Sequence, residues 1–169
     1  MYYQNSDNFW NQLNRLETLI KGAEVKAGIL FSFHSFIIGL FINKLAIYSE
    51  LFKENIPLFL LVICWIIIVA ISVYYCFSCF IPRMELKYDD NVFFYKDAIK
   101  AYGNLENYKK KMLEICNNEE DLHNQLSEQI HVESKIVNTK FESVKKSITY
   151  FGISLIFVVL ILVYIMFLS

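Results

Sequence analysis

Long apolar stretches alternate with polar segments along this chain. Residues 57–81 and 149–168 contain no Asp, Glu, Lys or Arg. Each is long enough to cross the roughly 30 Å of bilayer hydrocarbon, which takes about 20 helical residues. Residues 27–48 form a third stretch that contains His34 and, near its end, Lys44, whose ammonium can extend to the lipid headgroups. The pattern predicts three transmembrane helices.

The polar segment between the second and third stretches, residues 82–146, has the pattern of two helices. Apolar residues within 91–116 recur every three or four positions, which places them on one helical face. Asn117 and Asn118 supply a turn and an N-cap, and the acidic residues 119–121 suit the positive end of a second helix. No Pro or Gly separates that helix from the third apolar stretch, so we expect it to continue into the membrane.

Residues 1–25 repeat the amphipathic pattern and predict a helix that ends near Gly22. A hairpin of about sixty residues has a marginal core by itself. It therefore needs to pack against this N-terminal helix or against the hairpin of another subunit. The expected fold class is an all-α membrane protein with three transmembrane helices, a cytoplasmic helical hairpin and an N-terminal amphipathic helix.

Composition and charge support a lipid environment. Hydrophobic residues make up 56% of the chain and charged residues 20%, which is too apolar for an ordinary soluble domain. The net charge of −1 gives no electrostatic reason to expect nucleic acid as a partner. The N-terminus lacks the pattern of a cleaved signal peptide, so we expect the first apolar stretch to be retained.

The distribution of basic residues predicts the orientation in the membrane. Lys and Arg are frequent before the first stretch and between the second and third, whereas Lys44 and Lys53 are the basic residues of the short 44–56 loop. Short segments rich in Lys and Arg stay in the cytoplasm. We therefore expect the N-terminus and residues 82–146 to be cytoplasmic.

Small residues recur along the first apolar stretch at Gly28, Ser32, Ser35 and Gly39. Such spacing lets helix backbones approach closely, so this face should meet a helix of the same or another subunit. His34 lies beside the stripe. An ionisable residue within a membrane is a functional candidate, and a neutral histidine hydrogen-bonded to a neighbouring carbonyl is the alternative.

Catalytic and metal-binding patterns do not emerge from the sequence. The three histidines lie on different elements or exposed faces, and there is no H-E-x-x-H, nucleophile elbow or phosphate-binding glycine loop. Cys76 and Cys79 form a C-x-x-C without further ligands, which favours apolar packing over a metal site. We expect no enzymatic activity, no catalytic residues, no metal and no cofactor.

Several segments carry a family resemblance that covers nearly the whole chain. They are Glu24–Gly28, Asn91–Ala98, Asp121–Leu122, Gln129–Ile130, Ser134–Val137 and Lys140–Phe141. Together with the order of the spans, they resemble the transmembrane effector of Pycsar, the bacterial pyrimidine cyclase antiphage system. The resemblance implies an inner-membrane protein. It also implies that a partner cyclase makes a cyclic pyrimidine mononucleotide, cyclic CMP or cyclic UMP, and that the effector then disrupts the membrane in abortive infection.

Binding a cyclic mononucleotide needs a cation for the phosphate, a surface for stacking and polar groups for the base and ribose. The residues that this implied function assigns are Lys135 and Lys140 for phosphate, Phe93 and Phe94 for stacking, and Asn91, Asp97 and Gln129 for the base or ribose. Each is equally suited to helix pairing or to a membrane interface.

Three helices pack too tightly to enclose an aqueous channel, so membrane leakage requires a homo-oligomer or a large change in packing. The rest of the chain leaves two other functions open. One is a membrane-anchored helical scaffold or adaptor that recruits a cytosolic protein, and the other is a holin-like toxin that needs no ligand.

Overall fold

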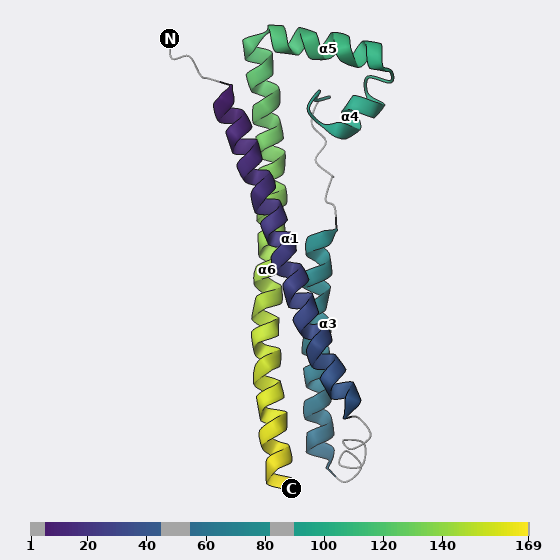
Figure 1. Ribbon diagram of the computed structural model, residues 1–169, viewed down its shortest axis with the longest axis vertical. Coiled ribbons are helices and arrows are strands. Elements are labelled where there is room, and N and C mark those ends of the chain that lie inside the picture. The colour runs from purple at the N-terminus through teal and green to yellow at the C-terminus, as the bar shows by residue number, and fades with distance from the viewer. Residues whose placement is uncertain (1–5, 45–54, 82–89, 169) are drawn as a thin grey trace. The chain divides into compact units, whose positions relative to one another are not determined.

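A computed structural model describes residues 6–44, 55–81 and 90–168 of the chain. About 90% of these residues are helical and none of them lies in a strand (Figure 1), which confirms the predicted all-α class, whereas the hairpin and its cytoplasmic side stay predictions. The helices are α1 (Asp7–Asn43), α3 (Ile56–Phe80), α4 (Tyr95–Lys100), α5 (Leu105–Asn117) and α6 (Glu119–Leu168). The end of the first predicted span, residues 45–48, lies outside the described residues.

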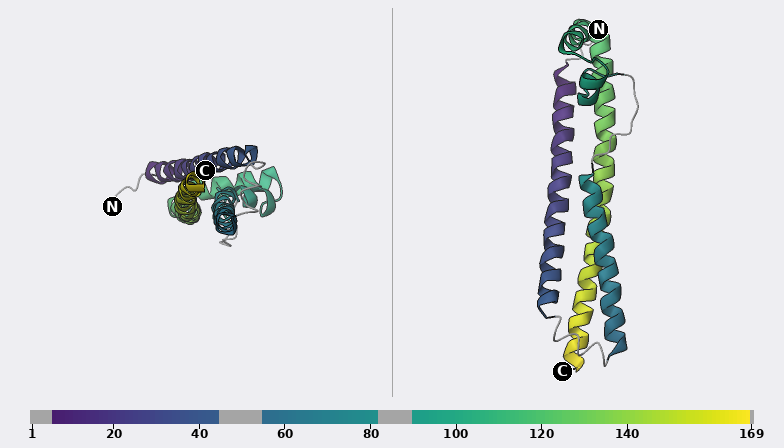
Figure 2. Two further views of the ribbon diagram at one scale, coloured as in Figure 1. Left: turned by 90° about the horizontal axis from the view of Figure 1, so that it is seen from below. Right: turned by 90° about the vertical axis from the view of Figure 1, so that its right-hand side faces the viewer.

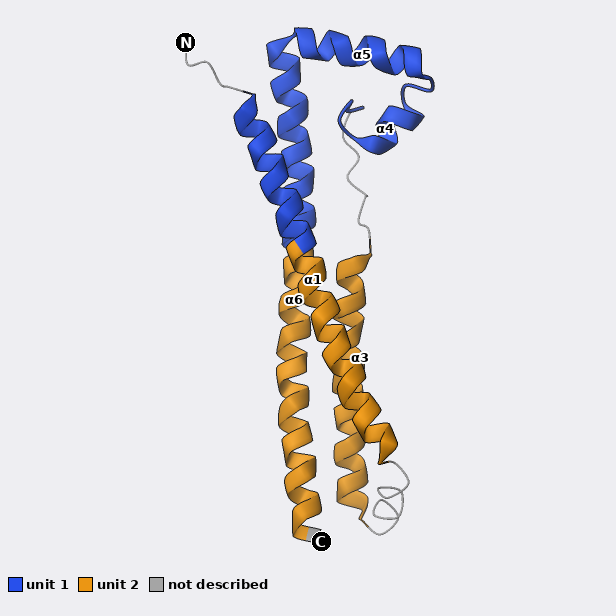
Figure 3. Cartoon of the chain, in the orientation of Figure 1, with its two compact units in different colours: residues 1–21, 82–138 blue, residues 22–81, 139–169 orange. Residues whose placement is uncertain are grey.

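The chain divides into two compact units, which Figure 3 distinguishes by colour. Unit 1 comprises residues 1–21 and 82–138, and unit 2 comprises residues 22–81 and 139–169. Helices α1 and α6, which Figure 2 shows from two further sides, each begin in unit 1 and end in unit 2. Both are uninterrupted. The predicted continuation of the second polar helix into the third span is therefore confirmed, whereas Gly22 lies inside α1 and does not end it.

Unit 2 is a bundle of three helices in which α3 runs antiparallel to α1 and α6. All three helices are long and apolar enough to span a membrane. Helix α3 starts after Asn55 with Pro57 in its first turn, where proline is favoured because its missing N–H would have no helical partner. Its position agrees with the predicted span 57–81.

Side chains pack inside unit 2 in three successive layers. An apolar layer consists of Leu58, Val62, Trp65, Val69 and Ile161, with Phe41 packed against Trp65 at a ring distance of 5.1 Å. A polar layer follows, formed by His34, Ser72, Cys76 and Ser147. A third layer, which we call the charged layer, consists of Ala23, Glu24, Ala27, Cys79, Lys140 and Val144.

Aromatic and basic side chains mark one level of unit 2. Tyr75 stacks on Tyr150 with ring centroids 5.8 Å apart, and the ammonium of Lys146 lies 5.4 Å from the Tyr75 centroid. The preceding residue on α3, Tyr74, is 65% exposed. Tyrosines and extended lysines are enriched where hydrocarbon meets headgroups. This tyrosine level therefore has the kinds of side chain that are typical of a membrane boundary.

Unit 1 contains α4, α5 and the first parts of α1 and α6. The sequence predicted one helix over residues 91–116, and the structure divides this segment into α4 and α5. Gly103 has φ +69°, a left-handed conformation that favours glycine, and Asn104 then caps α5 by accepting a hydrogen bond from the Asn107 N–H at 2.8 Å. Asn118 caps α6 as predicted, with its side chain accepting from the Glu120 N–H at 3.1 Å.

Candidate functional site

The charged layer places Lys140 inside unit 2. The residue is 7% exposed, and its ammonium donates to Glu24 Oε1 at 2.8 Å and to the carbonyl of Cys79. Cys79 lies in the last turn of α3, where the negative end of the helix dipole stabilises a cation. Lys140, which the sequence suggested for phosphate contact, thus joins α1, α3 and α6. Its partners could not be predicted from the residue pattern of α6 alone.

The polar layer joins the same three helices through a second set of hydrogen bonds. His34 is 1% exposed, and its Nε2 lies 2.8 Å from Ser72 Oγ. Ser72 donates to the Ser147 carbonyl at 2.9 Å, and Ser147 Oγ donates to the Ser72 carbonyl at 3.1 Å. The histidine partner is therefore a hydroxyl rather than the carbonyl that the sequence suggested. The sequence did not predict the roles of Ser72 and Ser147, because nothing distinguishes them there except that they are polar residues in or beside an apolar stretch.

Asn91 lies near the start of the second described segment of unit 1 and binds this segment to α6. Its Nδ2 donates to the Gln125 carbonyl at 2.9 Å and to Glu128 Oε2 at 3.0 Å, and its Oδ1 accepts from the Phe93 N–H at 2.9 Å. The Asn91 N–H donates to Asp97 Oδ2 at 3.1 Å. With 3% of its surface exposed, Asn91 uses its polar groups inside the protein.

The remaining residues of the predicted ligand cluster are distributed over unit 1. Phe93 packs edge-on against Trp10 with ring centroids 5.4 Å apart, and Phe94 contacts Tyr95. Gln129 Nε2 donates to Glu133 Oε1 at 3.2 Å. Lys135 is exposed on α6 and also belongs to unit 1, whereas Lys140 belongs to unit 2.

Glu133 should make the stability of the protein pH-dependent. Burial raises the pKa of its carboxyl above 4.5, the Gln129 hydrogen bond opposes this rise, and the charge of Glu17 adds to it. Its stabilising contribution is therefore fully present below the unfolded pKa and is lost as pH rises through the folded pKa. We expect Glu133→Gln to flatten the fall in the free energy of unfolding from about pH 4.5 towards neutral pH, measured by urea titration in micelles. An unchanged slope would contradict this role.

A polar pocket of about 290 Å³ lies in unit 1 at the turn between α4 and α5. Its lining is Ala101, Tyr102, Asn107, Lys110, Lys111 and Glu114. The Tyr102 hydroxyl is buried and has no hydrogen-bond partner among the described residues. Burial, followed by the charges of Asp90 and Asp97, raises the pKa of this phenol, so it remains a neutral donor. This pocket was not predicted from the sequence, because it is created by the break at Gly103.

The small-residue stripe of α1 faces outward. Ser32 and Ser35 are exposed, and each hydroxyl donates to a carbonyl four residues earlier in its own helix at 3.0 Å. Gly39 has no side chain of the described residues within 4 Å of an added Cβ, whereas Gly28 lies in ordinary contact distance of Phe80. Packing against another subunit stays a prediction.

Three membrane-length apolar helices together with a polar helical unit define a small all-α membrane protein. The family model of the Pycsar effector protein domain matches residues 8–167, so the chain belongs to the Pycsar effector family, as its sequence resemblance predicted. No curated protein and no solved structure matches it. The chain is therefore an antiphage defence effector of the inner membrane, functionally coupled to a cyclase.

Proposed function

We propose that unit 1 binds a cyclic pyrimidine mononucleotide made by the partner cyclase, and that binding causes unit 2 to disrupt the inner membrane. The observation that carries this proposal is the family match over residues 8–167, which includes both the polar unit and all three apolar helices. In this proposal the protein acts without enzymatic chemistry and without a cofactor.

The pocket at the α4–α5 turn is the nucleotide site in this proposal. Lys110 and Lys111 offer positive charge for one phosphate, the Tyr102 ring offers a surface for the base, and Asn107 offers an amide for its edge. Lys111 already pairs with Glu114 at 2.9 Å, so Lys110 is the stronger phosphate ligand. The unpartnered Tyr102 hydroxyl supports the assignment because buried polar groups usually have a partner.

Membrane damage requires a change in how the apolar helices associate. Side chains from two or three helices fill each of the layers described for unit 2, so the described part of one bundle is packed with side chains. The exposed stripe of α1 offers a face for a second copy. The nucleotide favours the damaging arrangement only by the difference between its affinities for the two states. We propose a homo-oligomer with unit 1 and the N-terminus in the cytoplasm.

The test is dye release from liposomes that contain the full-length protein. Cyclic CMP or cyclic UMP should release the dye, and cyclic AMP should not. Leakage without any nucleotide would support the holin-like toxin. Absence of leakage from correctly inserted protein would support the scaffold, and it would contradict the proposed function.

Substitution of Lys110 locates the site. A charge-assisted hydrogen bond contributes about 1.5–3 kcal/mol, so Lys110→Gln should raise the half-maximal nucleotide concentration by about 10- to 100-fold. Lys109→Gln removes a neighbouring exposed charge outside the pocket and should change it by less than about twofold. A large effect of Lys135→Gln with none of Lys110→Gln would instead place the phosphate at the sequence-predicted cluster. Lys140 is unsuitable for this test because its ammonium joins helices of unit 2.

A further inference from the structure

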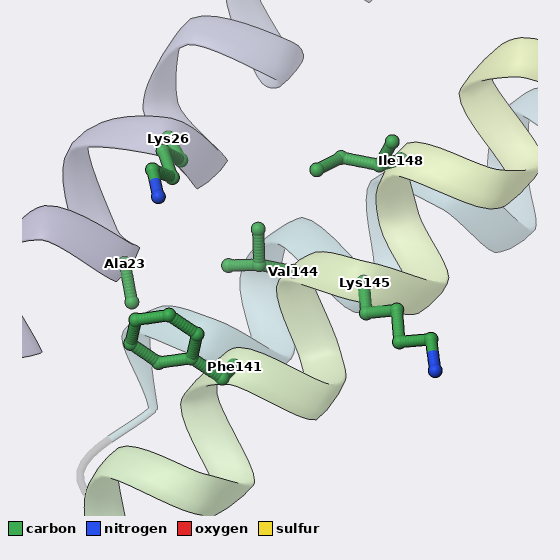
Figure 4. A pocket seen from close by; sticks show the side chains of 6 residues that line it. All are labelled: Ala23, Lys26, Phe141, Val144, Lys145 and Ile148. Atoms are coloured by element: carbon green, nitrogen blue, oxygen red, sulfur yellow. The ribbon is translucent and has the colours of Figure 1, made fainter.

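A second cavity lies within unit 2, in the groove between α1 and α6. It has a volume of about 220 Å³ and is lined by Ala23, Lys26, Phe141, Val144, Lys145 and Ile148 (Figure 4). Ala23 and Val144 are buried and form an apolar floor. The rim is open, since Phe141 is 38% and Ile148 49% exposed. The groove therefore combines an apolar floor with two lysines at its edges.

Both lysines are available to an anion. The Lys26 ammonium lies 5.6 Å from the centroid of the Phe141 ring, and neither Lys26 nor Lys145 forms an ion pair with a described residue. In Figure 4 Lys26 approaches the groove from α1, whereas Lys145 extends from α6 away from the ring. A lysine stem is flexible enough to turn its ammonium towards a bound group. The nearby acid Glu24 is neutralised by Lys140 at 2.8 Å and does not repel an anion strongly.

The groove lies at the membrane boundary of unit 2. Lys145 and Ile148 flank Lys146, whose ammonium packs on Tyr75 at the tyrosine level. Beyond this level α6 has no charged residue through Leu168. A ligand that enters the groove at this level, between α1 and α6, therefore comes from the headgroup region of a lipid leaflet.

We infer that this groove binds the headgroup of one anionic phospholipid. Lys26 and Lys145 hold its phosphate, and the apolar floor of Ala23 and Val144 contacts its glycerol and first methylenes. The group that the two lysines would bind is a phosphate, which a phospholipid headgroup and a nucleotide both carry. However, the lining has no amide, hydroxyl or carboxylate side chain to read the base or the ribose of a nucleotide.

Native mass spectrometry of the full-length protein, released from neutral detergent micelles, tests the inference. The probes are phosphatidylglycerol, phosphatidylcholine, inorganic phosphate and cyclic CMP. We expect one phosphatidylglycerol to be retained preferentially over phosphatidylcholine. Each lysine near an anionic lipid contributes about fivefold in affinity, so Lys26→Gln with Lys145→Gln should weaken retention about 25-fold.

Lys146→Gln is the matched control, because it removes the same charge from the same turn of α6 but does not line the groove. It should weaken retention less than about twofold. Equal effects of all three lysines, or equal retention of both lipids, would overturn the inference. Displacement of phosphatidylglycerol by inorganic phosphate or cyclic CMP at comparable concentration would also overturn it. Unchanged helicity by circular dichroism verifies that each variant is folded.

Discussion

Replacing Lys140 with methionine is expected to lower the free energy of unfolding by about 3 kcal/mol. Methionine keeps the length and apolar stem of lysine but removes the ammonium. The substitution leaves the Cys79 carbonyl and Glu24 without their charged donor. Breaking a buried ion pair by removing one partner costs about 3–5 kcal/mol. The lower end applies because the Glu24 side chain is 38% exposed and can be hydrated in part.

Thermal or denaturant unfolding in micelles, followed by circular dichroism, measures this loss. Lys140→Arg keeps the charge and should retain most of the stability. Lys145→Met provides a matched control at an exposed lysine five positions further along the same helix. If the Lys140→Met and Lys145→Met variants have the same free energy of unfolding, the ammonium of Lys140 does not join the three helices.

Replacing Asn91 with aspartate is expected to destabilise unit 1 by about 3 kcal/mol. Aspartate has the same shape but cannot donate, so the contacts to the Gln125 carbonyl at 2.9 Å and to Glu128 Oε2 at 3.0 Å become repulsive. A hydrogen bond to a charged group contributes about 1.5–3 kcal/mol and one to a neutral group about 0.5–1.5 kcal/mol. Amide hydrogen exchange of residues 91–100 should therefore accelerate by about 100-fold.

The double variant Asn91→Asp with Glu128→Gln distinguishes this network from a ligand role. The amide introduced at position 128 can donate to the carboxylate introduced at position 91 and so restore one of the two contacts, which gives a favourable coupling free energy in a double-mutant cycle. If hydrogen exchange stays native in Asn91→Asp while nucleotide-induced leakage is lost, Asn91 contacts the ligand instead, as the sequence analysis first suggested.

Periodicity predicted the helices better than it predicted their partners. The charge-free stretches specify α3 and the end of α6 because their length and composition suffice, independently of any contact. The break at Gly103 was missed because an isolated glycine within an amphipathic pattern is compatible with a helix as well as with a turn. The polar pocket at Tyr102 follows from that break, so it was missed with it.

The role of individual polar residues could not be predicted from their positions in the sequence. Lys140 and Lys145 both lie in the charged part of α6, yet one is buried in an ion pair and the other is exposed. His34 was a candidate from its place in an apolar stretch, but Ser72, 38 residues away, determines its environment. These pairings connect helices that are distant in the chain.

The amino-acid sequence by itself determined that this protein is helical, that three of its segments suit a bilayer and that it belongs to a defence family. The first two properties depend on composition, periodicity and local capping, which each segment carries alone, whereas the family follows from the match along residues 8–167. Only the tertiary structure decided which polar groups form hydrogen bonds or ion pairs between helices and which remain available for a ligand. A hydrogen bond or ion pair depends on where two distant segments meet, and packing of whole helices sets that position.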